Sequence, residues 1–184
     1  MTRALIAFAS RYGQTERIAL RIGKVLSDAG ASVDFADLTR VIPRLDGYEL
    51  VIVAGGVYFG KHPRPLERFV HANRDALAKV ESVLVSVSGS AATSAGMKDA
   101  EQIVDALVRR TGWTPKRTLL AGGATSYTKY NFLVRWMMRR IAAAHGGATD
   151  TSRDYEFTYW PEVDEFARAL LRAEEPHAIA SAEQ

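Results

Sequence analysis

The sequence predicts a doubly wound α/β fold, in which helices cover both faces of one parallel β-sheet. Three observations predict it: five short segments have the apolar character of buried strands, segments with helical periodicity alternate with them, and turns rich in glycine or hydroxyl residues follow the strands. Strands that alternate with helices form a parallel sheet, and strands covered on both faces are apolar without polar alternation.

The first half of the chain supplies three of the expected strands. Residues 3–9 are almost continuously apolar and lead into a helix whose inner residues recur at helical spacing, namely Ile18, Ala19, Ile22, Val25 and Leu26. Gly30 is placed to end that helix. Residues 32–36 form the second expected strand. Residues 48–54 form the third, whose β-branched centre makes it the clearest strand of the sequence.

The second half alternates in the same way. Pro65 is expected to open a helix, and strands are expected at residues 82–87 and 117–121 with a helix over about 98–110 between them. Residues 127–145 are expected to form a helix or a helical hairpin that ends at Gly146 and Gly147. A short extended piece at residues 155–158 precedes a last helix, which Pro161 opens.

Length and composition limit the class of protein. The 184 residues suffice for a single domain, which we expect over residues 1–175 with a flexible tail at 176–184. The chain has no cysteine, which excludes disulfides, thiolate metal sites and a cysteine nucleophile. No His, Asp and Glu cluster has metal-ligand spacing, so we expect no metal. Neither a signal-peptide pattern nor a membrane-spanning run is present, so we expect a cytoplasmic protein.

The charge is unevenly distributed. The formal net charge is +3 with a pI near 9.3, and eight basic but no acidic residues lie between Asp105 and Asp150. Such a segment indicates an anionic partner, which could be a membrane surface, an acidic small molecule or a nucleic acid. We disfavour a nucleic acid because aliphatic residues are interleaved with the basic ones.

Four loops are expected to meet at one edge of the sheet. They follow the first, third, fourth and fifth strands, at residues 10–15, 55–61, 86–90 and 122–127. Doubly wound folds bind ligands beyond the carboxyl ends of their strands. Three of these loops combine glycine with hydroxyl or aromatic residues, a composition that suits a phosphate and a planar ring.

The loop Ser10-Arg11-Tyr12-Gly13-Gln14-Thr15 is the candidate phosphate site. It places backbone N–H groups, hydroxyls and the positive end of a helix dipole around one small volume. In the alternative, Ser10 or Thr15 merely caps its own helix. Arg11 and Tyr12 could face either the ligand or solvent.

This loop resembles the phosphate loop of flavodoxin-like FMN proteins, a hydroxyl residue followed by x-x-Gly-x-Thr, although Tyr12 stands where the commoner form has Thr. The order of elements, the arginine-bearing aromatic insert at about 127–158, and Gly146-Gly147-x-Thr149-Asp150-Thr151 followed by Trp160 look like a narrower family, the flavodoxin-fold, menaquinone-dependent protoporphyrinogen oxidases. The resemblance runs from Arg3 to about Leu171. It implies a flavodoxin-like sheet with strand order 2-1-3-4-5 and a basic helical insert after the fifth strand.

The resemblance implies FMN as the cofactor, with a deazaflavin as the alternative. Tyr58 or Phe59 would pack on the flavin ring, unless one of them belongs to the core, and the serine-rich loop would bind the pyrimidine edge, unless it is a plain polar loop. The expected cofactor-binding residues are Ser10, Arg11, Tyr12, Gly13, Gln14, Thr15, Gly56, Tyr58, Phe59, Gly60, Ser86, Ser88, Gly89 and Ser90.

Basic residues beyond these loops are weaker candidates for contact with a substrate or a membrane. Lys61, His62 and Arg64 stand where the propionates of a porphyrinogen would enter, or are simply solvated; His62 could accept a proton or lie on the surface. In the insert, Phe132, Leu133, Trp136, Met137 and Ile141 form a wide apolar face beside a stripe of Asn131, Arg135 and Arg139. With Lys129 nearby, this segment suits an anionic membrane, or else a core helix.

The resemblance implies an enzyme of haem biosynthesis that oxidises protoporphyrinogen IX to protoporphyrin IX with a menaquinone-type acceptor. The flavin carries the redox step, so no catalytic side chain is assigned. Peripheral contact with the inner face of the cell membrane would bring the protein to its quinone. The alternatives are a flavodoxin-type electron carrier and a quinone reductase of the same fold with a nicotinamide or deazaflavin cofactor. The sequence leaves the redox potential and the oligomeric state open.

Overall fold

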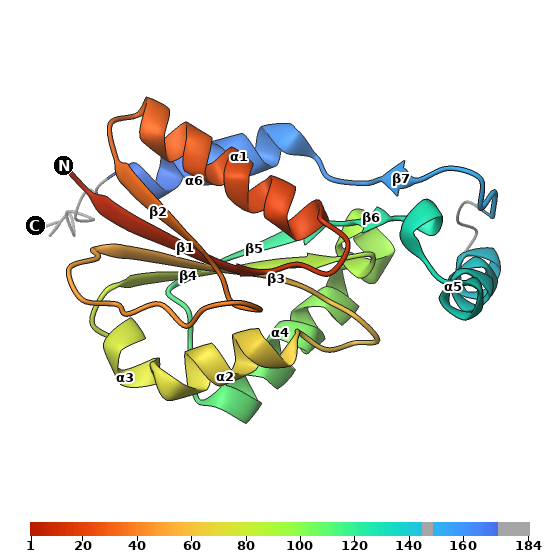
Figure 1. The fold of residues 1–184 in the computed structure, drawn as a ribbon, viewed down its shortest axis with the longest axis horizontal. Helices are drawn as coiled ribbons and strands as arrows, with labels where there is room; N and C mark the ends of the chain where they lie inside the picture. Colours follow the sequence, from red (N-terminus) through yellow and green to blue (C-terminus); the bar gives the residue numbers. More distant parts are fainter. Residues whose placement is uncertain (145–148, 173–184) are drawn as a thin grey trace, which may run out of the picture.

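The computed structural model describes residues 1–144 and 149–172. Its centre is a five-stranded parallel sheet with the order β2-β1-β3-β4-β5 (Figure 1). The strands are β1 (Arg3–Ala9), β2 (Ser32–Asp37), β3 (Leu50–Gly56), β4 (Glu81–Ser88) and β5 (Arg117–Gly122). The predicted fold class and strand order are confirmed, and the observed strands differ from the expected ones by one or two residues at their ends.

Helices cover both faces of the sheet. One face carries α1 (Gln14–Asp28) and α6 (Trp160–Leu171), and the other carries α2 (Arg64–Ala72), the short α3 (Arg74–Leu77) and α4 (Met97–Thr111). Because both faces are packed, all seven residues of β3 are buried, which explains its uninterrupted apolar sequence. Helix α2 begins at Arg64, one residue before Pro65, and α3 was not predicted.

The ends of α1 show why these residues form a helix there. Its apolar residues Ile18, Ile22 and Leu26 are fully buried against the sheet. Just beyond its last turn, Gly30 adopts a φ of 91°, a left-handed conformation that favours glycine. The predicted helix end is therefore confirmed.

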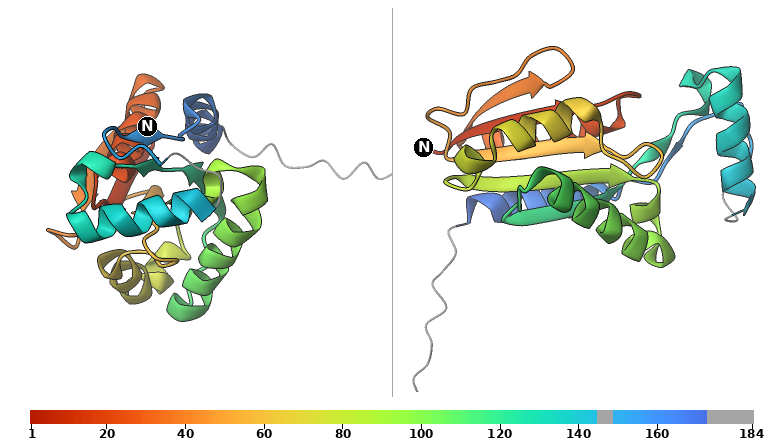
Figure 2. Two further views of the ribbon diagram at one scale, coloured as in Figure 1. Left: turned by 90° about the vertical axis from the view of Figure 1, so that its right-hand side faces the viewer. Right: turned by 90° about the horizontal axis from the view of Figure 1, so that it is seen from below.

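The insert after β5 forms a separate arm beyond the carboxyl end of the sheet (Figures 1 and 2). Its two sides pair as a short antiparallel ribbon, β6 (Ala124–Thr125) with β7 (Tyr155–Glu156). Between them lie the 3₁₀ turn η3 (Tyr127–Lys129) and the helix α5 (Phe132–Ala144). The expected helix end at Gly146 and Gly147 and the expected tail at 176–184 lie outside the described residues.

The described residues contain neither a membrane-spanning helix nor a cluster of metal-binding side chains. No helix there has the length and apolarity needed to cross a bilayer. In the same part of the chain, no group of three or more His, Asp or Glu side chains is arranged to hold a metal ion.

Candidate functional site

The carboxyl ends of four strands bring the predicted loops together. The register pairs Ala9 of β1 with Gly55 of β3, and Gly55 in turn with Ser86 of β4, so that these strands end level with one another. The chain leaves β1 toward the α1 face and β3 toward the α2 face. This is the topological switch point, where a crevice opens in doubly wound sheets.

The loop between β1 and α1 has the backbone of an anion site. Gly13 has a φ of 99°, and its N–H donates to Ser10 Oγ at 3.1 Å. The Arg17 N–H makes the first helical hydrogen bond, to the Gly13 carbonyl at 3.0 Å, so the N–H groups of Gln14 and Thr15 precede the helical ladder. These donors stand at the positive end of the helix dipole. Ser10 thus binds the N-cap residue Gly13, and α1 itself has no side-chain cap.

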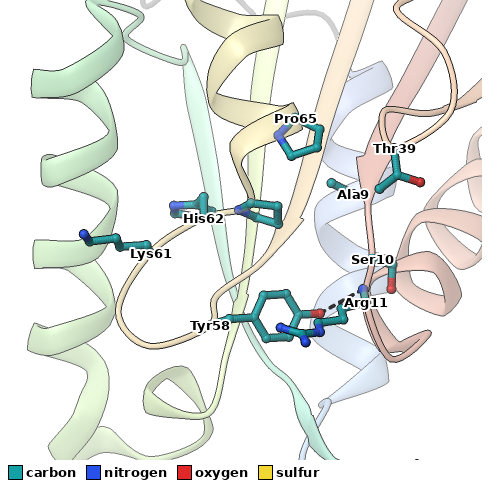
Figure 3. Close-up of a pocket in the computed structure, with 9 residues that line it drawn as sticks. Ala9, Ser10, Arg11, Thr39, Tyr58, Lys61, His62 and Pro65 are labelled. Carbon is teal, nitrogen blue, oxygen red and sulfur yellow. Dashed lines mark hydrogen bonds between the residues drawn. The ribbon is translucent and has the colours of Figure 1, made fainter.

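The hydroxyl of Tyr58, a residue expected to pack on the flavin ring, lies in the candidate phosphate loop. Tyr58 Oη accepts the Arg11 N–H at 3.0 Å (Figure 3). Burial raises the pKa of the Tyr58 hydroxyl, and the N–H groups of Arg11 and Tyr12 partly oppose this effect. The loop therefore already directs backbone donors at an oxygen atom.

Gly56 provides the space for this arrangement. A Cβ atom on Gly56 would stand 2.8 Å from Tyr58 Oη and 3.0 Å from Thr15 Oγ1, both too close. Thr15 is itself almost completely buried. Because Gly56 lacks a Cβ atom, the hydroxyls of Tyr58 and Thr15 can both lie close to it.

The aromatic loop itself is a tight turn. The backbones of Tyr58 and Lys61 exchange two hydrogen bonds, of 2.9 and 3.1 Å. Phe59 and Gly60 between them have positive φ values of 52° and 73°. Phe59 is 67% exposed and Tyr58 is half-buried, so neither is a core residue.

Two predicted loop residues belong instead to the buried end of β4. The strand continues through Ser88, and Ser86 Oγ lies 3.0 Å from His62 Nε2. Ser88 Oγ accepts the Ala91 N–H at 3.0 Å and so fixes the start of the following 3₁₀ turn, Ser90–Ala92. Of the four predicted residues of this loop, Gly89 and Ser90 remain outside the strand.

His62 is buried, which makes the expectation of a surface position wrong. Only 3% of the residue is exposed, and its Nδ1 atom has no hydrogen-bond partner. Burial lowers the pKa of the imidazole to about 4, with Glu67 raising it and Arg110 lowering it to smaller extents. The ring is therefore neutral at physiological pH.

An open pocket of about 520 Å³ lies beside Tyr58 (Figure 3). The pocket lies between the end of β1 and the turn before α2. Lys61, which is exposed, lies at its rim. Arg64 is exposed and does not line it. The lining residues are Ala9, Ser10, Arg11, Thr39, Tyr58, Lys61, His62, Pro63 and Pro65.

Lys129, a candidate for contact with a substrate or a membrane, contacts the candidate phosphate loop. Its Nζ donates to the Tyr12 carbonyl at 2.8 Å, across 117 residues of sequence. The Tyr12 ring lies edge-on to Tyr58 and Tyr130, with centroid distances of 5.7 and 4.7 Å. Sequence reasoning missed Tyr130 because nothing local to it indicates a partner so far along the chain.

The remaining predicted residues of the insert lie on α5. Arg135 donates to the carbonyls of Tyr127 and Tyr130, at 2.9 and 3.1 Å, and thereby ties the helix to the preceding turn. Trp136 is 51% exposed, and Phe132 and Leu133 are more exposed still. For these three residues the core alternative is wrong. The side chain of Ile141 lies outside the described residues.

Comparisons with known proteins agree with this architecture. A family model described as "Flavodoxin domain" matches residues 5–152. The protoporphyrinogen IX dehydrogenase (quinone) of Escherichia coli strain K12 is 27% identical over 91% of this chain and 94% of its own length. The Leishmania major protein of the same name is 24% identical over 90% of this chain and 73% of its own.

Among solved structures, oxidised flavodoxin 1 from Bacillus cereus superposes with a TM-score of 0.52 over 94% of this chain and all of that one. Its sequence identity is 14%, so this likeness shows the fold alone.

Proposed function

Because the chain belongs to the flavodoxin domain family, we propose that it is an FMN-dependent oxidoreductase. We propose further that it oxidises protoporphyrinogen IX to protoporphyrin IX and passes the electrons to a menaquinone-type quinone. The likeness to the two dehydrogenases of this substrate spans about nine-tenths of the chain and includes the insert. The enzyme assignment rests on that likeness, and the cofactor assignment rests on the loop.

The observation that supports the cofactor proposal is the hydrogen bond between the phosphate loop and the Tyr58 hydroxyl oxygen. Tyr58 Oη occupies a point to which the Arg11 N–H is directed at 3.0 Å, beside the buried Thr15. A phosphate oxygen is a stronger acceptor than a phenol oxygen, because it is charged. The loop residues therefore fit a phosphate, on condition that the Tyr58 side chain moves aside.

The chain supplies binding and orientation to the bound cofactor. The hydroxyl of Ser10 and the N–H groups of Gln14 and Thr15 would hold the phosphate at the start of α1. The ends of β3 and β4, with Gly56 and Gly89, would flank the ring. FMN, when bound, supplies the two-electron redox chemistry that these side chains lack.

The surroundings of the site suit an anionic porphyrinogen. Lys61 stands at the rim of the 520 Å³ pocket, and Arg11 and Arg64 are exposed near it. Cations of this kind bind carboxylates such as propionates. The neutral His62 lies behind them and presents no charge of its own.

The acceptor proposal rests on α5. Phe132, Leu133 and Trp136 are exposed on this helix, and the Arg140 guanidinium lies 5.2 Å from the centre of the Trp136 ring. A helix with exposed apolar side chains beside basic ones suits an anionic membrane surface, where a quinone is dissolved. We propose that the enzyme contacts such a surface through α5.

The deciding experiment is anaerobic absorption spectroscopy of the purified protein supplied with FMN. We expect a bound-flavin band, its bleaching by protoporphyrinogen IX, and its return on addition of a menaquinone analogue. A protein that binds no FMN would contradict the cofactor assignment. Bleaching by NAD(P)H but not by the porphyrinogen would instead assign a quinone reductase.

A further inference from the structure

The insert contacts the candidate phosphate loop at two residues, Tyr12 and Gln14. The insert has an outgoing arm, which runs from β6 to α5, and a returning arm, which runs from α5 through β7 to α6. On the outgoing arm, Lys129 Nζ donates to the Tyr12 carbonyl at 2.8 Å, and the Tyr130 ring lies 4.7 Å from the Tyr12 ring. Tyr130 is buried in this position. The loop residue that departs from the common pattern is thus the one that the outgoing arm contacts.

The returning arm contacts the next part of the loop. Gln14 Nε2 donates to Thr158 Oγ1 at 2.7 Å and to Glu156 at 3.1 Å. Thr158 Oγ1 in turn donates to the Gly122 carbonyl at the end of β5, at 2.6 Å. The returning arm therefore ties the first residue of α1 to the sheet.

The two arms are joined to each other, so the contacts act as one unit. The β6 and β7 strands pair, and the Thr128 N–H and hydroxyl both donate to Asp154 at 2.9 Å. Between Tyr12 and Gln14, Gly13 has its left-handed φ of 99°. The insert thus holds the residues on either side of the one glycine whose conformation shapes the loop.

Lys129 also brings charge to this point. Its Nζ stands 3.5 Å from the position of a Cβ atom on Gly13. Its hydrogen bond to Tyr12 fixes the peptide plane between Tyr12 and Gly13, and thereby the direction of the Gly13 N–H. A cation so close also adds to the positive potential of the helix end.

We propose that Lys129 is a positioning residue for the phosphate of the cofactor, which makes the base of the insert a part of the cofactor site. This inference rests on the proposed function, because it concerns a bound FMN. Lys129 acts through the Tyr12 carbonyl and the shape of the loop. The aromatic contact between Tyr12 and Tyr130 holds the same residue of the loop.

The test compares two ligands that differ only in the phosphate, FMN and riboflavin. We expect Lys129→Met to weaken FMN binding about tenfold, as for loss of a charge-assisted hydrogen bond, and to change riboflavin binding less than about twofold. Lys129→Arg, which keeps the charge and the donor, should restore most of the FMN affinity. Lys79→Met is the matched control, because it removes an exposed lysine at the opposite end of the strands.

The outcomes separate this inference from the proposed function. If the wild type binds neither ligand, the cofactor assignment fails. If the wild type binds FMN and Lys129→Met binds it equally well, only the role of Lys129 is wrong. An equal loss of FMN and riboflavin affinity in Lys129→Met, with a lower melting temperature, would likewise overturn it, because the lysine would then be merely structural.

Discussion

At the scale of single residues, Tyr58 and a phosphate compete for the same donors. The Tyr58 hydroxyl accepts the Arg11 N–H at 3.0 Å, so a bound phosphate must displace it. We expect Tyr58→Phe to bind FMN about three- to tenfold more tightly, since one competing hydrogen bond is removed and the ring is kept. Titration calorimetry of the apoprotein measures this, with the exposed Tyr159→Phe as the control.

A weaker affinity of Tyr58→Phe would contradict this account, because it would mean that the hydroxyl contacts the bound cofactor. The same titration with inorganic phosphate isolates the loop from the ring. There too we expect the variant to bind more tightly than the wild type.

His62 makes the stability of the fold depend on pH. Burial lowers the pKa of the imidazole from 6.5 to about 4, so below pH 6.5 the unfolded chain binds a proton that the folded chain does not. The wild type therefore loses stability as the pH falls from about 6.5 to about 4, by about 3 kcal/mol in all.

Urea unfolding at a series of pH values measures this loss as a difference from His62→Gln. We expect the stability advantage of the wild type over this variant to shrink by that amount between pH 7 and pH 4. His71→Gln, which replaces the exposed histidine of α2, is the control. A pH-independent difference for His62→Gln would mean that the imidazole binds a proton as readily in the folded chain as in the unfolded one.

At the scale of elements, α5 carries the most conspicuous exposed apolar surface of the described residues. Phe132 and Leu133 are 84% and 68% exposed on neighbouring positions. We expect the double variant Phe132→Ser, Leu133→Ser to reduce binding to phosphatidylglycerol vesicles at least tenfold, because burying apolar area drives such binding. Sedimentation with vesicles measures this.

The chain offers a matched control for that experiment. Val41 and Ile42 form another exposed apolar pair, in the loop after β2, and are 52% and 73% exposed. Their replacement by serine should leave vesicle binding unchanged. If both double variants bind like the wild type, or if phosphatidylcholine vesicles bind as well as anionic ones, α5 is not an anionic-membrane contact.

At the scale of the whole molecule, binding of FMN at the phosphate loop should stabilise the insert. Both arms of the insert contact the phosphate loop, while α5 lies apart from the sheet (Figure 2). Binding that stabilises the loop must stabilise the arms that hold it, because coupling between two sites is reciprocal. We expect FMN to slow tryptic cleavage after the basic residues of α5 about fivefold.

Limited proteolysis with and without FMN gives this ratio directly. Lys129→Met should lose most of the protection even at saturating FMN, whereas Lys79→Met should keep it. Equal cleavage rates of the wild type with and without FMN would show that the arm and the loop are independent.

The sequence by itself determined the sheet and the edge where the site lies. Buried parallel strands must be apolar throughout, as residues 50–54 are, and strands alternating with helices admit few topologies. The hydroxyl, glycine and helix start of residues 10–15 lie together in sequence, so their conformation could be predicted locally. The exposed Phe59, by contrast, follows from a turn that no periodicity indicates.

Only the tertiary structure decided which distant groups meet. The Tyr58 hydroxyl on Arg11, the buried pair of His62 and Ser86, and Lys129 on Tyr12 each join segments separated by 24 to 117 residues. Such contacts depend on strand register and on where the insert returns to the sheet. The spacing of residues along the chain predicts neither, because both depend on how the strands, helices and insert pack against one another.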